Sequence, residues 1–309
     1  MKTIDGQMEE PSGRNWRSFG ALTGLVGLNA FHDNFARFTL IPLSTWLLGE
    51  GTSLPHLLSF LLLLPFILFA PTSGWLADRF SKTAVVRWSV WLQVAVLGVM
   101  AAGAYFQSLW GVVGAFFLLA LQSALLSPAK QGILKELLGR KRLALGSGIT
   151  EGVVILMILG GQIASGLVFD ARLRETGNGW EAAFGPIGFL MVGCVLALVL
   201  GQFVERVEAR GAERLSARRA FGHFADLKTV MRERPMRLSV WGVAFFWGFA
   251  GFVNLAVIQV AAEMNAGGVG TGSANSLMMG AASVGIAVGS LLAGWWSRKG
   301  TELGLIPFG

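Results

Sequence analysis

Three polar side chains interrupt the first long apolar stretch of the chain. Asn29, Asp33 and Arg37 lie within residues 19–48, and their spacing of four places them above one another on a single face of a helix. If this helix crosses a bilayer, its carboxylate and guanidinium are costly unless they face a protein interior or a wet cavity. A lipid anchor gains nothing from such a stripe, so the pattern favours a transport pathway.

The composition is that of a membrane protein. The 309 residues are 53% hydrophobic and only 14% charged, whereas soluble domains carry about 25% charged residues. The single cysteine, Cys194, lies in an apolar run, which excludes a disulfide framework and favours a small buried hydrophobe. We find no Ser-His-Asp, metal-ligand or glycine-rich phosphate pattern, so we expect no catalytic residues, cofactor or metal and do not expect an enzyme.

Eight apolar stretches are long enough to cross a membrane as helices. They cover residues 18–48, 54–76, 84–105, 108–130, 144–169, 181–203, 238–261 and 273–297. With the N-terminus inside, 22 of the 25 lysines and arginines fall in cytoplasmic segments, and only Arg172 and Arg174 fall in outer loops. This asymmetry predicts a cytoplasmic N-terminus. It also explains the net charge of +7 through topology and contact with anionic membrane lipids, without a nucleic-acid partner.

Two local motifs recur at nearly the same offset. GLNAFHDNF from Gly27 resembles GFAGFVNLA from Gly248 at a shift of 221, and GWLADRFSK from Gly74 resembles GWWSRKGTE from Gly294 at a shift of 220. An even number of spans separates the copies, so they run parallel in the membrane. Parallel repeats are the plan of the major facilitator transporters. We therefore predict an all-α, polytopic major-facilitator-like bundle, with about eight of twelve expected helices present.

The repeat also predicts the domain organisation. We expect a cytoplasmic tail (1–17), an N-terminal six-helix bundle (18–203), a charged cytoplasmic linker (204–237) and the first two helices of an incomplete C-terminal bundle (238–309). By this logic about four C-terminal spans are missing, and the sequence is a fragment of a larger transporter.

The loop after the second span carries a charged motif. Gly74 allows helices to approach closely, Asp78 can accept hydrogen bonds at a helix end, and Arg79 and Lys82 can pair with acids or lipid headgroups. The motif resembles the signature loop of the major facilitator superfamily, and the resemblance implies a conformational latch. Its second copy contributes Arg298. The alternative is an ordinary solvated turn.

Two further charges lie close to the ends of predicted spans. Lys130 follows Pro128 near the end of the fourth span, where it can meet an anionic lipid phosphate or simply snorkel to the inner boundary. Glu151 lies about two turns inside the fifth span, and its expected partners are Lys130, Arg37 or the loop cations. A structural ion pair and a substrate or cation site are equally compatible with this position. His32 adjoins Asp33 but points off its face, so a proton relay is the less favoured interpretation.

Several longer strings resemble the bacterial lysophospholipid transporters, a family of the major facilitator superfamily that is often called LplT. They are NAFHDNFARF (29–38), LPFILFAPTSGWLADRFSK (64–82), LLSPAKQGIL (125–134), GSGITEGVVILMILGGQIASGLVFD (146–170) and FFWGFAGF (245–252). The resemblance implies inward flipping of lysophospholipids, such as lysophosphatidylethanolamine, across the bacterial inner membrane by alternating access. It also implies a phospholipid acyltransferase as a partner that rebuilds diacyl lipid.

The resemblance further assigns residues to the substrate site. Asp33 matches the acid of the family's first span, Lys130 the lysine of its SPAK-like motif, and Glu151 its fifth-span acid. Asn254 stands where these transporters can have an arginine in the seventh span, so a headgroup phosphate loses that partner, and Arg37 or Lys130 is expected to replace it.

Two other functions remain open at this stage. One is a major facilitator exporter of a drug or small metabolite, whose cavity would be closed to lipid. The other is a membrane partner of an acyltransferase that transports nothing. Competition by a water-soluble substrate discriminates the first from a lipid transporter. Flux retained after Asp33→Ala, together with a lost acyltransferase interaction, would favour the second.

Overall fold

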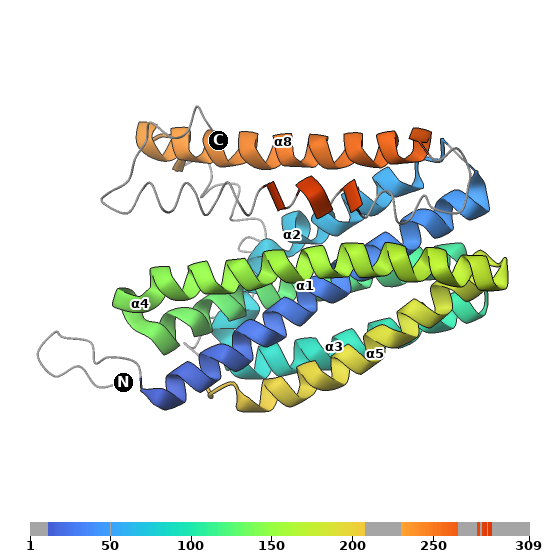
Figure 1. The fold of residues 1–309 in the computed structure, drawn as a ribbon. Coiled ribbons are helices and arrows are strands. Elements are labelled where there is room, and N and C mark those ends of the chain that lie inside the picture. Colours follow the sequence, from blue (N-terminus) through green and yellow to red (C-terminus); the bar gives the residue numbers. More distant parts are fainter. Residues whose placement is uncertain are drawn as a thin grey trace, which may run out of the picture.

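The computed structural model describes residues 12–49, 51–207 and 230–264, together with positions 277–278, 280–282 and 284–285. In these ranges the chain forms helices joined by short turns, without strands (Figure 1). The helices are α1 (Gly13–Leu48), α2 (Leu54–Arg79), α3 (Lys82–Tyr105), α4 (Leu109–Thr176), α5 (Gly179–Phe203) and α8 (Arg234–Met264). The all-α prediction is therefore confirmed for the described part of the chain.

The long helix α4 comprises two predicted spans joined at a kink. Gly139 has φ 63° and ψ 179° inside it, a backbone conformation that glycine adopts without the steric cost of a Cβ. The two arms, Leu109–Gly139 and Leu145–Thr176, are each long and apolar enough to cross a membrane, as are α2, α3 and α5. The first arm extends nine residues beyond the predicted span end at 130, so most of the expected connection between the fourth and fifth spans is helical. The second arm extends seven residues beyond the predicted span end at 169.

Two described helices begin before the predicted spans. α1 begins at Gly13, five residues before the predicted first span at residue 18, and Ser12 caps it by accepting a hydrogen bond from the Asn15 backbone. α8 begins at Arg234, inside the predicted linker. Most of the eighth predicted span, 273–297, lies outside the described residues.

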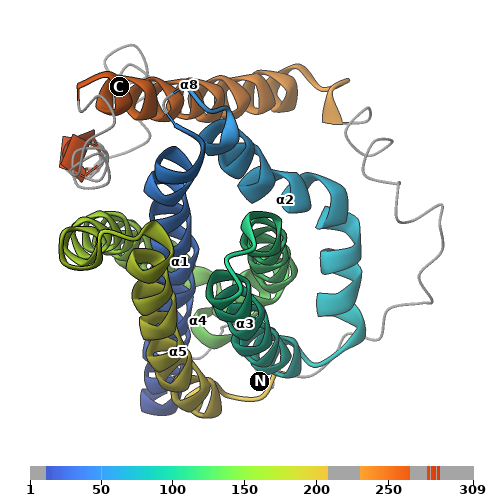
Figure 2. The same ribbon diagram turned by 90° about the vertical axis from the view of Figure 1, so that its right-hand side faces the viewer.

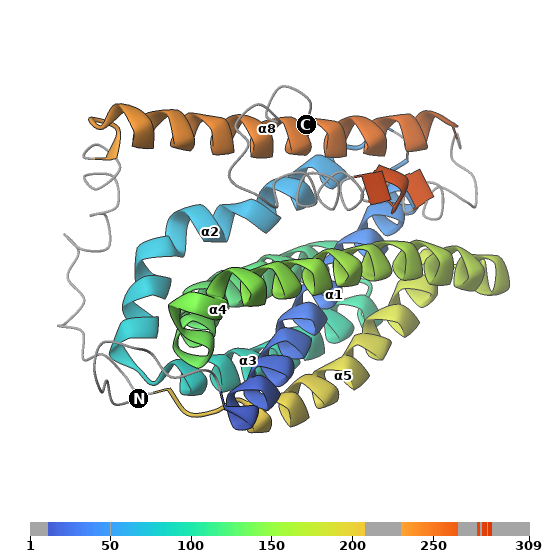
Figure 3. The same cartoon turned by 60° about the vertical axis from the view of Figure 1, so that its left-hand side comes forward.

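Helix α1 is the most enclosed element of the bundle. Every residue from Phe35 to Ser44 is buried, which requires neighbours on all sides of the helix. α4 and α5 pack along it, and α3 packs against both of these (Figures 2 and 3). Because other helices surround α1, its polar residues are kept away from lipid. This helix therefore does not need the apolarity of the five membrane-capable segments, which are α2, α3, α5 and the two arms of α4.

The next helix along the chain, α2, is bent. Figure 2 shows α2 arching around one side of the bundle, and Pro65 and Pro71 lie within it. A proline inside a helix removes one backbone hydrogen bond and kinks the axis. The bend lets α2 contact both α1 and α4.

A close backbone approach fixes the position of α1 on the second arm of α4. A Cβ added to Gly161 would lie 2.7 Å from the carbonyl oxygen of Phe31 and 3.2 Å from the backbone nitrogen of Phe35. A side chain at this point would push the helices apart, as expected where small residues allow membrane helices to pack closely. This contact places residues 29–33 in the interior.

The described part of the second half lies along one side of the bundle. α8 lies above α2 in each of the three views (Figures 1, 2 and 3). Gly280 belongs to the short helical pieces that follow, and a Cβ there would lie 2.9 Å from Cδ1 of Ile163 on α4. This contact joins residues of the two predicted halves.

Candidate functional site

The centre of the candidate site is a short chain of hydrogen bonds between α1 and the first arm of α4. Asn29 and Asp33 are both buried. The Asn29 amide donates to Oγ of Ser123 at 2.8 Å and to Oδ2 of Asp33 at 3.3 Å. Oγ of Ser123 donates to the same Oδ2 at 2.6 Å. Two of the three residues expected along α1 therefore meet, and a serine that the sequence did not single out joins them.

Helix α3 and Gln122 hold the other side of Asn29. Nε2 of Gln122 and of Gln93 donate to Oδ1 of Asn29 at 3.0 Å and 3.3 Å. Gln122 also donates to Oγ of Ser89 at 2.6 Å. We call the six residues Asn29, Asp33, Ser89, Gln93, Gln122 and Ser123 the buried polar cluster. Their shared signal in the sequence is polarity inside apolar spans, which predicts glue between helices but does not say which side chains meet.

One acceptor in the cluster remains unused. Oδ1 of Asp33 is buried and has no hydrogen-bond partner among the described residues. The Lys130 ammonium, on the same arm of α4 as Ser123, acts electrostatically on this carboxylate. Lys130 is half-buried, and no ion pair joins it to another side chain in the described ranges. A buried carboxylate oxygen without a donor can receive one from a polar, charged ligand.

Arg37 is buried as expected, but it points toward another neighbour. Its Nη2 donates to Oγ of Ser59 on α2 at 2.6 Å, and its guanidinium lies 5.6 Å from the ring centroid of Phe38. The face that was expected to carry three site residues therefore divides, with Asn29 and Asp33 directed to α3 and α4 and Arg37 to α2.

The other expected substrate residues do not join the cluster. Glu151 is exposed, and within the described ranges no ion pair links it to Lys130, to Arg37 or to the loop cations, so the expected pairing is not observed. Asn254 belongs to α8, but its side chain lies outside the described residues. His32 packs against Gly193 of α5, on another face of α1 than Asp33.

Lys82 of the predicted latch loop forms an ion pair with a residue of α4. Nζ of Lys82 lies 3.0 Å from Oε1 of Glu136 on α4, and the Lys82 side chain is only 3% exposed. A Cβ on Gly132 would lie 2.7 Å from the Lys82 stem, so this glycine makes room for the lysine one turn before Glu136. The pair joins the start of α3 to the end of the first arm of α4.

The remaining latch residues lie at the surface of the described structure or beyond it. Asp78 and Arg79 are exposed. A Cβ on Gly74 would meet no described atom within 4 Å, so the expected close helix approach is not seen at this glycine. Arg298 lies outside the described residues.

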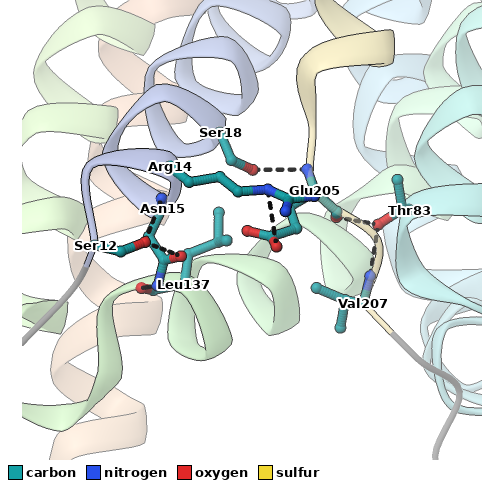
Figure 4. A network of polar contacts seen from close by, with 8 residues as sticks. All are labelled: Ser12, Arg14, Asn15, Ser18, Thr83, Leu137, Glu205 and Val207. Atoms are coloured by element: carbon teal, nitrogen blue, oxygen red, sulfur yellow. Dashed lines mark hydrogen bonds and ion pairs between the residues drawn. The ribbon is translucent and has the colours of Figure 1, made fainter. Parts of the chain in front are cut away.

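A second polar network, which sequence reasoning missed, ties the end of α5 to the bundle (Figure 4). Oγ1 of Thr83 donates to the carbonyl of Glu205 at 2.7 Å and accepts from the backbone nitrogen of Val207 at 3.0 Å. The backbone nitrogen of Glu205 donates to Oγ of Ser18 at 2.8 Å, and its carboxylate lies 3.3 Å from Nε of Arg14. The first residues of the predicted linker are therefore fastened beside the latch loop.

Two curated relatives are similar in sequence over most of this chain. The lysophospholipid transporter LplT of Pectobacterium carotovorum subsp. carotovorum (strain PC1) is 29% identical over 278 residues, which cover 89% of this chain and 63% of the relative. The protein of the same name from Yersinia pestis (strain Pestoides F) is 28% identical over 295 residues, covering 95% and 68%. The chain thus spans about two thirds of the length of these relatives.

Solved transporter structures share the fold. The inward-facing, unoccupied crystal structure of a bacterial homologue of the human lysosomal transporter Spinster has a TM-score of 0.62 at 21% identity, over 93% of this chain and 63% of that one. A bacterial homologue of the human drug peptide transporters PepT1 and PepT2 gives 0.57 at 13%, over 91% and 71%. At these identities the likeness concerns the fold alone.

The profile of one protein family matches nearly the whole chain, from residue 26 to residue 308. The match includes both copies of the predicted repeat, and the five membrane-capable helices fit a multi-pass membrane protein. The chain therefore belongs to the Major Facilitator Superfamily.

Proposed function

We propose that this chain is the larger part of a transporter that moves lysophospholipids across the bacterial inner membrane by alternating access, with its N-terminus in the cytoplasm. The observation that carries the proposal is the unpartnered Oδ1 of Asp33, buried in an apolar bundle and acted on by Lys130. An amphiphile with one charged headgroup and one acyl chain suits a small polar centre surrounded by apolar helices. The names of the two relatives support the lipid class.

The proposed roles follow from charge and position. Lys130 attracts the headgroup phosphate, since it is a half-buried cation without an ion pair in the described ranges. Asp33 and Asn29 form the polar end of the site, and Arg37, Glu151 and Asn254 remain proposed contributors from other faces. Lys82, paired with Glu136, is proposed to stabilise one conformation of the latch together with Gly74, Asp78, Arg79 and Arg298. A phospholipid acyltransferase is the proposed consumer of the delivered lipid.

The test is uptake of a labelled lysophospholipid by proteoliposomes that contain the full-length protein. Asp33→Asn and Lys130→Met should each lower uptake at least about tenfold, since each removes one charge from the site. The matched control is Ser165→Ala, which deletes a buried hydroxyl between α1 and α4, where Ser165 meets Thr39 at 2.8 Å, without touching the buried polar cluster.

The outcome separates the alternatives. A wild-type protein that moves no lysophospholipid, but whose flux of a water-soluble compound is measurable, would replace lipid transport by export of a soluble substrate. Unchanged lipid uptake in both charge variants would remove Asp33 and Lys130 from the site while leaving the transporter itself intact.

A further inference from the structure

The orientation of the Asn29 amide is fixed by its neighbours. Oδ1 of Asn29 receives two amide donors, from Gln93 and Gln122. An amide oxygen only accepts, whereas an amide nitrogen only donates. The nitrogen of Asn29 must therefore face the other way, toward Ser123 and Asp33, where it donates to both.

This orientation commits the single proton of the Ser123 hydroxyl. Because Oγ of Ser123 already accepts from Asn29 at 2.8 Å, its proton can bond to Oδ2 of Asp33 at 2.6 Å or to Oε1 of Gln122 at 3.4 Å. The shorter distance and the charge of the carboxylate favour Asp33. A serine hydroxyl has one proton to donate. Oδ2 thus receives two donors, while Oδ1 receives none from the described residues.

The Asp33 carboxylate is therefore held in one rotational position, with Oδ2 hydrogen-bonded and Oδ1 without a donor among the described residues. Ser123 is 7% exposed and Asp33 is 8% exposed, so bulk water does not supply the missing donor. An unsatisfied buried acceptor is costly, and each such group in a native protein calls for an explanation. A ligand that brings a charged N–H donor to Oδ1 removes the cost, because charge-assisted hydrogen bonds are about twice as strong as neutral ones.

We propose that Ser123 is a positioning residue that directs Oδ1 of Asp33 toward the ammonium of an ethanolamine-type headgroup, and that it thereby sets headgroup preference. The inference rests on the proposed function. Lys130 is seven residues from Ser123, about 10 Å along the same helical face, so it attracts the phosphate of such a zwitterion from the other end. A glycerol headgroup has no ammonium and gains no charge-assisted bond from Oδ1.

The experiment compares two lysolipids in proteoliposomes with the full-length protein. The lysophosphatidylethanolamine and the lysophosphatidylglycerol are chosen with the same acyl chain. Their headgroups differ, because ethanolamine carries an ammonium group and glycerol carries none. Ser123→Ala should raise the KM for the ethanolamine lipid about tenfold, as expected when a charged hydrogen bond is misdirected, and should leave the KM for the glycerol lipid within about twofold. Ser165→Ala, which removes a buried hydroxyl that bonds α1 to the second arm of α4, should change neither.

Two further variants guard against a folding defect. Ser123→Cys is nearly the same size but a weak donor, so it should shift headgroup preference in the same direction as alanine. Ser123→Thr keeps the hydroxyl and should restore the preference. A structural role alone would alter the uptake of both lipids in parallel and would not change their ratio.

The failures are distinguishable. Wild-type protein that moves neither lipid overturns the proposed function, and this inference falls with it. Uptake of both lipids with equal losses in Ser123→Ala and Ser123→Cys overturns only the inference. If Ser123→Ala shifts the pH dependence of uptake equally for both lipids and leaves the ratio of their KM values unchanged, the inference is also overturned. Oδ1 would then bind only a proton.

Discussion

Single residues show how this protein accommodates polarity in an apolar bundle. Asn29 is held by Gln93, Gln122 and Ser123, and this satisfaction reduces the penalty of burying an amide. Arg37 reaches Ser59 at 2.6 Å, and Lys82 reaches Glu136 at 3.0 Å. Each of these three side chains is therefore bonded to another helix, so polar residues also specify which helices pack together.

The Lys82–Glu136 pair gives a prediction at this scale. Lys82→Met should lower stability, because it removes an ammonium that pairs with Glu136, while a stem of similar length still fills the space over Gly132. A double-mutant cycle with Glu136→Gln should give a coupling free energy of about 1–2 kcal/mol. The measurement is denaturant unfolding of the purified protein in detergent. A coupling free energy near zero would show that the interaction between Lys82 and Glu136 does not stabilise the protein.

Helix α4 organises the bundle at the level of elements. Its kink at Gly139 separates two arms that both contact α1. The first arm supplies Gln122 and Ser123 to the buried polar cluster, while the second approaches α1 through Gly161. Because α1 is buried on all sides from residue 35 to residue 44, a shift of either arm moves the site.

The close contact at Gly161 predicts that a side chain added at this position lowers the stability of the protein. Gly161→Val should destabilise the protein by about 1–3 kcal/mol, as overpacking of a close contact does, since its Cβ would lie 2.7 Å from the Phe31 carbonyl oxygen. Gly152→Val is the matched control on the same arm, because a Cβ there meets no described atom within 4 Å. Thermal unfolding midpoints of the two variants test this difference, and equal midpoints would contradict the close contact.

The whole molecule adds a relation between the predicted halves. The family profile spans both, from residue 26 to residue 308, and Gly280 of the second half meets Ile163 of the first. Alternating access in repeat-built transporters proceeds largely by rocking one half against the other. A contact between halves at α4 is therefore expected to change during the cycle.

A cross-link across this contact tests the motion. Ile163→Cys with Gly280→Cys, in a Cys194→Ala background, places two thiols within reach of disulfide formation. Oxidation should abolish lysolipid uptake, and reduction should restore it, while each single-cysteine variant should be insensitive to the oxidant. Full uptake by a protein shown to be cross-linked would mean that this contact is fixed throughout the cycle.

The sequence alone determined the helices and much of the chemistry. Apolar length predicted helices in six stretches between residues 18 and 203. All six stretches are helical, and five of the helical segments are long and apolar enough to cross a membrane. The cost of intramembrane charge singled out Asp33 and Arg37, and both are buried. These predictions succeed because span length, helical periodicity and the cost of a charge in lipid are local properties of the chain.

Only the tertiary structure decided which partners these residues have. Spacing along α1 gives the angle of a side chain, but the helix that meets that angle depends on packing between distant segments. Ser123 of α4 therefore came to Asp33, Ser59 of α2 to Arg37, and Glu136 to Lys82, whereas Glu151 forms no ion pair with its expected partners within the described part of the chain. The choice follows from where glycines allow backbones to approach and where prolines bend the helices, and these effects act across the whole bundle.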